Sequence, residues 1–411
     1  MSKDRFYSIA LAIDVLLLLM MGITAIYSTT YAVANNHFLS HQIAWVILGG
    51  AMTTLLAVIP LEFLSRVSKY ILIAIGVVLA YLALANIGSL MAERFLHVKI
   101  AGAFPFAQVR NGACRWLTFA GITIQPAEFA KFALILFLSS YYGTRDSKAI
   151  ASAYEGFWVP AGASAVILCL ILAGRSFSNT LVTGLVVGIL MYLAGVRYRW
   201  LLFVLLCGLV FGAAVILATP FRRQRILNYL QRDKESVELV NSGPKVDNYQ
   251  QDRSRSAIGS GGVTGYGIAK GRLKHKSIPE SRTDFIFAVI GEEAGFLGMM
   301  AGILLYLVFM LLCSLIAQQC RDRQGMLICL TIGFYLPLQA MLNLGVVSGL
   351  LPVTGVTAPL VSYGGSSILS VMFCIGLVFN ICHRNAQMNE KGEVPPVRDT
   401  FPLLLHQSPE K

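Results

Sequence analysis

The 411-residue sequence is short of charge: only 13% of its residues are Asp, Glu, Lys or Arg, whereas 56% are hydrophobic. This balance excludes an ordinary soluble domain, in which about a quarter of the residues are charged. Histidine is scarce, and the six scattered residues offer no metal-ligand spacing. The eight cysteines give no disulfide framework, because all except Cys114 lie in or beside apolar segments. A mean hydropathy of +0.67 indicates a chain whose natural solvent is a lipid bilayer.

Long hydrophobic runs recur from residue 7 to residue 382. A helix that crosses a bilayer needs roughly 20 mainly apolar residues, and by that measure the sequence contains about ten such segments. They lie at 7–29, 41–60, 68–88, 124–143, 157–174, 177–196, 199–218, 284–318, 325–347 and 359–382. We therefore expect an all-α polytopic membrane protein with one membrane domain over residues 1–390, followed by a flexible cytoplasmic tail over 391–411.

Lys and Arg in short loops predict the orientation, because they are retained on the cytoplasmic side. They recur in alternate loops, at Lys3, Arg5, Arg66, Lys69, Arg145, Lys148, Arg197, Arg199, Arg321, Arg323 and Arg384. Both termini are then cytoplasmic, and a large extracytoplasmic loop over about 219–283 separates helices 7 and 8.

This large loop is basic. Residues 221–284 hold 13 Lys and Arg against 7 Asp and Glu, a net of +6 within a chain of net charge +12. Such an excess beside a membrane suits an anionic ligand such as a pyrophosphate headgroup, although a plainly solvated loop has the same composition. Nucleic acid is not expected, because no stacking aromatics are interleaved with the basic residues.

Charged residues inside a span are costly, which makes Glu128 and Lys131 candidates for function. They stand three residues apart on one helical face, so they can form an ion pair; a purely structural pair is the alternative. Just upstream, Arg115 can bind a phosphate and Trp116 can pack on a sugar. An aromatic anchor at headgroup level with a snorkelling arginine explains these two residues equally well.

Asp284 stands with Thr283 where a helix cap is expected, so capping is one interpretation of this acid. The other is a general base toward a sugar hydroxyl, because the carboxylate lies at the outer edge of the membrane among basic residues such as Lys270 and Lys274. Glu292 and Glu293 lie about 80° and 180° away around a helix, so we expect no three-acid cluster.

The segment from Asn343 to Ser367 is rich in Gly, Pro and Ser, which break helices. At bilayer depth an irregular backbone is tolerated only against protein or a water-filled cavity. We therefore expect this segment to line a site, with Ser362, Tyr363 and Ser366 as candidate ligand contacts. A structural helix break without ligand contact is the alternative.

Taken together, these motifs resemble the SEDS family (shape, elongation, division and sporulation), and the resemblance covers nearly all of the membrane domain. The matching segments occur in order at Gly112–Trp116, Gln125–Lys131, Ala257–Gly262, Pro279–Glu293 and Asn343–Ser367. The resemblance implies a peptidoglycan glycosyltransferase of the bacterial inner membrane that joins lipid II units into glycan strands. It also implies a class B penicillin-binding protein as the partner that cross-links the peptides.

In that family the acid of the Thr-Asp-Phe motif is the residue most associated with activity, which implies that Asp284 is the catalytic base. Supporting or substrate-binding roles are expected for Arg115, Trp116, Glu128, Lys131, Lys270, Lys274, Glu280, Ser362, Tyr363 and Ser366. Arg115 and Lys131 would balance charge on the departing undecaprenyl pyrophosphate. The resemblance implies no organic cofactor, and a divalent cation (Mg²⁺ or Mn²⁺) is compatible with it.

The segments Pro352–Gly355 and Ile290–Glu293 are more similar to elongation-type (RodA) members than to division-type (FtsW) members. One departure concerns the sixth helix, whose usual Pro-Asp-Leu-Gly-Thr opening is Ser176-Phe-Ser-Asn-Thr180 here and lacks the acid. Three alternatives therefore stay open: a division-type polymerase, a lipid II flippase, and a noncatalytic scaffold for the penicillin-binding protein. The sequence has no convincing internal repeat of the kind common in transporters.

Overall fold

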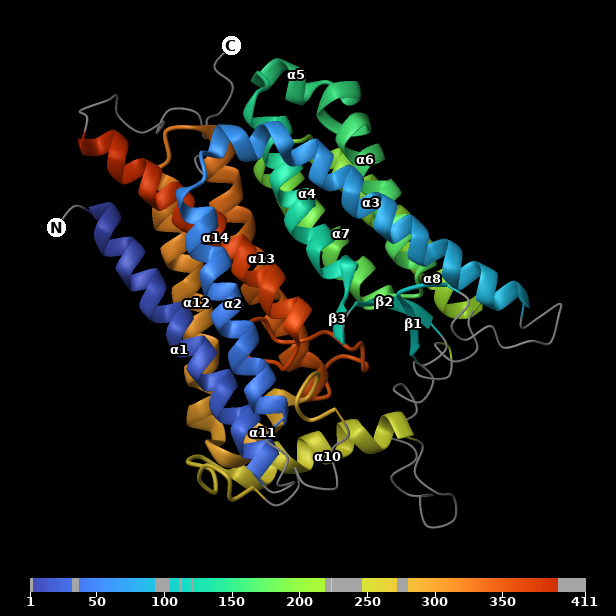
Figure 1. The fold of residues 1–411 in the computed structure, drawn as a ribbon, viewed down its shortest axis with the longest axis vertical. Helices are drawn as coiled ribbons and strands as arrows, with labels where there is room; N and C mark the ends of the chain where they lie inside the picture. The colour runs from blue at the N-terminus through green and yellow to red at the C-terminus, as the bar shows by residue number, and fades with distance from the viewer. Residues whose placement is uncertain are drawn as a thin grey trace.

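The computed structural model describes residues 3–31, 37–92, 104–110, 113–119, 121–218, 223, 246–271 and 280–390. Lys274 and the tail over 391–411 lie outside these ranges. Among the described residues, every predicted span contains a long helix (Figure 1). These helices are α1 (Lys3–Tyr31), α2 (His37–Val58), α3 (Leu61–Met91), α4 (Pro126–Gly143), α6 (Val159–Ala173), α7 (Phe177–Leu193), α8 (Tyr198–Ala218), α12 (Gly295–Gln319), α13 (Arg323–Val347) and α14 (Gly365–Glu390).

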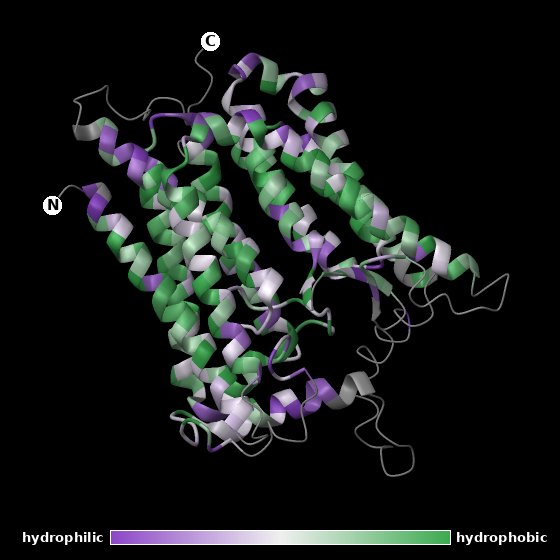
Figure 2. Ribbon diagram, viewed as in Figure 1, coloured by the Kyte–Doolittle hydropathy of each residue, from purple (hydrophilic) through white to green (hydrophobic). Residues whose placement is uncertain are grey.

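Seven helical segments of the described chain are long and apolar enough to cross a membrane, and two shorter apolar helices coincide with α7 and α8. Hydrophobic residues make up most of the middle of these helices, while hydrophilic residues are more frequent toward their ends (Figure 2). The predicted fold class, an all-α polytopic membrane protein, is therefore confirmed. The remaining described helices are short or lie outside the spans: α5 (Ser147–Ala151), a π-helical turn (Tyr154–Trp158), α10 (Val246–Gly261) and α11 (Ile286–Glu293).

The eighth span departs from the prediction, because it is two helices rather than one. The chain breaks between α11 and α12 at Gly295, whose φ of +65° is open mainly to glycine. A side chain there would also collide with the turn at Val263, since an added β-carbon would lie 2.5 Å from its carbonyl oxygen. The break lets the amides of Phe296 and Leu297 bind the carbonyls of Gly262 and Val263. The last helix also begins later than predicted, at Gly365 rather than at residue 359.

A small antiparallel sheet follows α3 and was not predicted. Its strands are β1 (Ala107–Arg110), β2 (Ala113–Phe119) and β3 (Ile122–Ile124), in the order β1-β2-β3. Gly121, with φ +80°, lies in the two-residue connection between β2 and β3. β3 then leads through Gln125 directly into α4, so the sheet sets where α4 begins.

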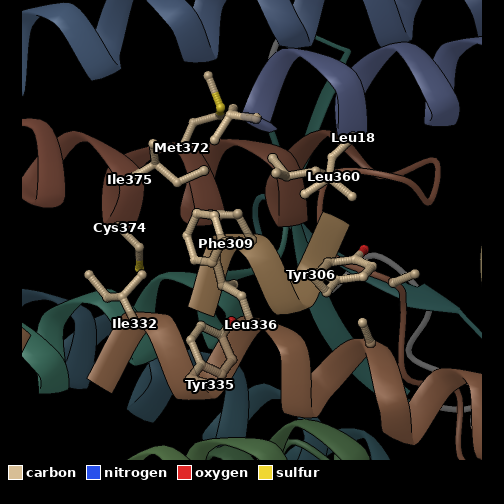
Figure 3. Packing of buried hydrophobic residues seen from close by; sticks show 14 of the residues in the cluster. Leu18, Tyr306, Phe309, Ile332, Tyr335, Leu336, Leu360, Met372, Cys374 and Ile375 are labelled. Atoms are coloured by element: carbon tan, nitrogen blue, oxygen red, sulfur yellow. The ribbon is translucent and has the colours of Figure 1, made fainter. Parts of the chain in front are cut away.

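The main core lies where α1, α12, α13 and α14 pack together (Figure 3). Leu18, Tyr306, Phe309, Leu336 and Ile375 are fully or almost fully buried there. A second cluster joins α4 to α3, α6 and α7. The two clusters hold the helices on either side of the irregular segment between α13 and α14.

The basic loops predicted to be cytoplasmic meet at one end of the molecule. Arg384 contacts Asp322 at 2.9 Å and Glu62 at 3.1 Å, and Arg323 donates to the carbonyls of Ala194 (2.6 Å) and Arg145 (3.5 Å). The sheet, α10 and α11 lie at the opposite end (Figure 1). Following the predicted orientation, we call the end with Arg384 the inner end and the end with the sheet the outer end.

Candidate functional site

Asp284 lies in a turn over residues 280–285 at the outer end, just before α11. Three consecutive carbonyls of this turn are held by hydrogen bonds from the chain around α13 and α14. The Tyr363 amide, Ser362 Oγ and Asn343 Nδ2 donate to the carbonyls of residues 282, 283 and 284 at 2.8, 2.6 and 2.7 Å, respectively. Asn343 Nδ2 also donates to the Val356 carbonyl at 2.6 Å. The turn is therefore fixed to the irregular segment, and Asp284 is positioned by a rigid frame.

Asp284 does not occupy the cap position of α11. The residue at the N-cap is Phe285, and its side chain makes no capping hydrogen bond. The capping interpretation is therefore not supported, and the general-base interpretation stays a prediction. The Asp284 side chain lies against Gly355, because a β-carbon placed on that glycine would lie 3.4 Å from Asp284 Oδ2.

The start of α7 reaches the same place. Ser178 Oγ donates to the Thr354 carbonyl and lies 4.0 Å from the position of a β-carbon on Gly355. The α7 opening that lacks the family's usual acid is thus close to the Asp284 carboxylate. At this point the chain presents a serine hydroxyl and a bare glycine, so a ligand can approach the backbone closely.

Ser362, Tyr363 and Ser366, which we predicted as ligand contacts, brace the irregular segment. Ser362 Oγ accepts from the Ala358 amide at 2.8 Å while it donates to the turn of Asp284. The Tyr363 ring meets the Phe38 ring at 5.3 Å, and burial raises the pKa of its hydroxyl while Arg282 opposes that rise. Ser366 Oγ accepts from the Gln125 amide at 2.9 Å, at the junction of β3 and α4. Ligand contact by these three residues stays a prediction.

The predicted ion pair between Glu128 and Lys131 is confirmed. Lys131 Nζ lies 2.8 Å from Glu128 Oε2, and both side chains are buried. The ammonium also stands 5.6 Å from the centre of the Tyr335 ring, and Ser370 Oγ donates to the Glu128 carbonyl. Because Lys131 is completely buried, its charge is compensated by Glu128 inside the protein and does not face the outer surface.

Arg115 and Trp116 lie on β2, partly buried. The Arg115 Nε is buried without a hydrogen-bond partner. Burial lowers the pKa of the Arg115 guanidinium, and the neighbouring positive charge of Arg175 lowers it further, although arginine stays charged. Arg175 immediately precedes the α7 opening that contacts Thr354. Arg115 and Arg175 therefore form a positive region beside the start of α7.

The described part of the Gly-rich loop, residues 262–271, folds over Glu293. The Glu293 carboxylate accepts from the amides of Ala269 (3.2 Å) and Gly271 (3.4 Å), and Ser28 Oγ donates to it as well. Lys270 is exposed on this loop. Glu280 is also exposed and accepts from Thr283 Oγ1 at 2.9 Å, which stiffens the turn before Asp284. Lys274 lies outside the described residues.

Within the described ranges, no group of three or more His, Cys, Asp or Glu side chains is placed to hold a metal ion. Mg²⁺ in phosphate-binding sites is commonly held by one or two carboxylates together with substrate phosphates. The partly exposed Asp284 carboxylate fits such a shared arrangement, in which the ion would neutralise phosphate charge.

Sequence analysis did not single out three residues that shape the site, Asn343, Gly355 and Ser178, although all three lie in segments that it named. Asn343 is an amide within a mostly apolar helix, which is a usable signal for a structural or functional role. The other two take part through contacts between segments distant in sequence, and local patterns carry no sign of these.

The fold and this site define a polytopic membrane protein with a positioned carboxylate and a positive region at its outer end. Residues 6–387 match the FtsW/RodA/SpoVE family, described as cell cycle proteins. The chain belongs to this family, which confirms the resemblance to SEDS proteins, and it is a multi-pass bacterial membrane protein.

Relatives with assigned names agree with this placement. The chain is 32% identical over 398 residues to the probable peptidoglycan glycosyltransferase FtsW of Bacillus subtilis, covering 93% of this chain and 91% of that protein. It is 35% identical over 278 residues to the stage V sporulation protein E of the same organism, covering 66% and 72%.

Two solved structures share the fold. One belongs to a peptidoglycan synthase complex that coordinates polymerization and crosslinking, with a TM-score of 0.69, 23% identity, and coverage of 92% of this chain and 98% of that chain. The other is the rod shape determining protein RodA of Thermus thermophilus, with a TM-score of 0.63, 23% identity, and coverage of 91% and 95%.

Proposed function

We propose that this protein is a peptidoglycan glycosyltransferase that polymerises lipid II into glycan strands at the outer face of the membrane. Its membership of the FtsW/RodA/SpoVE family and the naming of its FtsW relatives as peptidoglycan glycosyltransferases support this assignment. The observation that carries it is the Asp284 carboxylate, whose turn is held by three hydrogen bonds to its backbone carbonyls and which is not at the N-cap of α11.

In the proposed mechanism Asp284 accepts the proton of the 4-hydroxyl of the GlcNAc in the incoming lipid II. The oxygen of that hydroxyl then forms a bond to the anomeric carbon of the MurNAc at the end of the growing strand. The bond between this carbon and the undecaprenyl pyrophosphate oxygen breaks, and the pyrophosphate leaves with the electron pair. Arg115, with Arg175 beside it, supplies the positive charge that stabilises the leaving group.

Lys131 takes a different role from the one expected from the sequence. Because it is completely buried and paired with Glu128, we assign it to the positioning of α4 rather than to contact with the pyrophosphate. α4 in turn fixes the junction with β3 that Ser366 holds. The pair thus stabilises the start of α4, which contacts β2 and its positive region.

A class B penicillin-binding protein is the proposed partner, because the structure with a TM-score of 0.69 belongs to a complex that couples polymerization to crosslinking. We propose an elongation role from the sequences of Pro352–Gly355 and Ile290–Glu293, which are more similar to elongation-type members. A division role is the second candidate, favoured by relatives named FtsW. Depleting the protein separates these roles, since loss of an elongation enzyme rounds the cells and loss of a division enzyme gives filaments.

The decisive assay is strand formation from labelled lipid II by the purified protein with its cognate class B partner. We expect long glycan strands that are retained when the transpeptidase is blocked by a β-lactam. If strand formation depends only on the catalytic residues of the partner, this protein is a scaffold. Transfer of labelled lipid II across vesicles without any strand would indicate a flippase.

A further inference from the structure

The sheet at the outer end has two unlike faces. Residues that pair directly across antiparallel strands lie on the same face. Leu117 pairs with both Ala107 and Ile124, and Phe119 pairs with Ile122, which makes one face apolar. The other face pairs Gln108 with Trp116 and Thr118 with Thr123, and Thr118 Oγ1 lies 3.2 Å from Gln108 Oε1.

The apolar face is left uncovered at its tip. Phe106, Phe119 and Ile122 are 59%, 66% and 48% exposed. The rings of Phe106 and Phe119 lie 5.6 Å apart, and Phe106 has a φ of +64°, in a region that L-residues seldom occupy. A strained backbone that presents an exposed phenylalanine points to a function for that side chain.

The position of the sheet relative to the membrane follows from its attachment to α3. Tyr81 Oη donates to the Pro105 carbonyl, and the Tyr81 and Phe104 rings meet edge to face at 6.5 Å. Tyr81 comes 12 residues after Lys69, the last basic residue at the inner end of α3, which is about 18 Å along a helix. The hydrocarbon core of a bilayer is roughly 30 Å thick, so the sheet is attached at the depth of the outer leaflet.

The tip is also an extension of a lipid-facing surface. Beyond Tyr81, α3 keeps exposing apolar side chains, with Leu84 66%, Ile87 42% and Met91 58% exposed. Arg115 lies two residues before Leu117 on β2, where the pairing with β1 shifts register, and next to Cys114, whose amide donates to Asn86 of α3. Apolar residues at the tip with a cation farther along the strand match the order of acyl chains and phosphates in a leaflet.

We propose that the apolar face of the β1–β3 sheet is a membrane wedge, whose Phe106, Phe119 and Ile122 side chains insert into the acyl region of the outer leaflet. The occupant of this face is bulk membrane lipid, because the face continues the exposed apolar flank of α3. The wedge fixes the depth of β2 and of the start of α4, and so holds Arg115 at the level of lipid phosphates.

Tryptophan substitutions on neighbouring residues of opposite faces test the wedge. Phe119→Trp and the matched control Thr118→Trp are placed in nanodiscs of phosphatidylcholine with or without brominated acyl chains, and the signal of the wild-type tryptophans is subtracted. We expect strong additional quenching for Phe119→Trp and little for Thr118→Trp. Both variants are checked for monodispersity and thermal unfolding, and the readout does not depend on enzymatic activity.

Equal quenching of both variants, or of neither, would overturn the proposal. A third outcome would also overturn it: the tryptophan of Phe119→Trp is not quenched, and its emission shifts to the blue only when the class B partner is added. The face would then be a protein docking surface.

Discussion

Asn343 is the residue through which α13 holds the turn of Asp284. Its amide nitrogen donates to the carbonyls of Asp284 and Val356, so it joins the two segments that meet at the site. Gln339, four residues earlier on the same helix, makes a comparable bond to the Thr357 carbonyl without touching the turn.

This pair of amides gives a matched test of positioning. We expect Asn343→Ala to lose about 1–3 kcal/mol of stability, because buried carbonyls are left without donors, and to lose most strand formation. Gln339→Ala is expected to lose similar stability and much less activity. Thermal unfolding and lipid II polymerisation measure the two effects, and equal losses of activity would contradict a positioning role for Asn343.

The Glu128–Lys131 pair makes a prediction about stability. Glu128→Gln alone leaves a buried ammonium uncompensated, so it is expected to destabilise the protein by about 3–5 kcal/mol. The double variant Glu128→Gln, Lys131→Met removes both charges and is expected to be less destabilised and to keep activity. A stable but inactive double variant would instead support direct contact between Lys131 and the pyrophosphate.

At the scale of elements, the helices could be predicted because each span is a long apolar run that the bilayer itself requires. The sheet could not, since the strands of the 107–124 region are short and mix apolar, polar and basic residues. The break at Gly295 depends on the approach of Val263, a contact that sequence patterns do not carry. In the site, Asp284 could be predicted from its motif and its place beside the membrane, whereas its neighbours Ser178 and Gly355 are brought in by tertiary packing.

The irregular segment between α13 and α14 is tested at Gly355, with Gly262 of the loop after α10 as the control, since both glycines have positive φ. Gly355→Ala places a methyl group 3.4 Å from the Asp284 carboxylate and adds backbone strain of about 1–2 kcal/mol at φ +77°. Gly262→Ala adds comparable strain at φ +57°, where an added β-carbon meets no atom within 4 Å. We expect both to lower the unfolding temperature and only Gly355→Ala to impair polymerisation strongly; equal activities would argue against a ligand path over Gly355.

For the whole molecule, the orientation makes a prediction. The contacts of Arg384 with Asp322 and Glu62 bring the basic loops to one end, which the distribution of Lys and Arg predicts to be cytoplasmic. Green fluorescent protein fused after Glu390 should therefore fluoresce, and alkaline phosphatase fused there should be inactive. The reverse pattern would place the site of Asp284 in the cytoplasm and contradict the proposed reaction.

The site as a whole combines a fixed carboxylate, a glycine beside it, and a positive region formed by Arg115 of β2 and Arg175 just before α7. We expect this combination to support polymerisation without the acid that the family usually carries at the start of α7. The position of that acid is Phe177 in this chain, and the next residue, Ser178, donates to the Thr354 carbonyl beside Gly355, so a hydroxyl binds the segment that lies against Asp284.

The most direct measurement is the rate of strand formation from lipid II by the complex with the class B partner, comparing Asp284→Asn with Asp146→Asn at the inner end. Asparagine keeps the shape of the carboxylate and removes its basicity, so we predict a loss of about 10²–10⁴-fold for Asp284→Asn, with normal folding and partner binding. Asp146→Asn should keep the wild-type rate. Strand formation by Asp284→Asn at the wild-type rate would contradict the assignment of Asp284 as the general base.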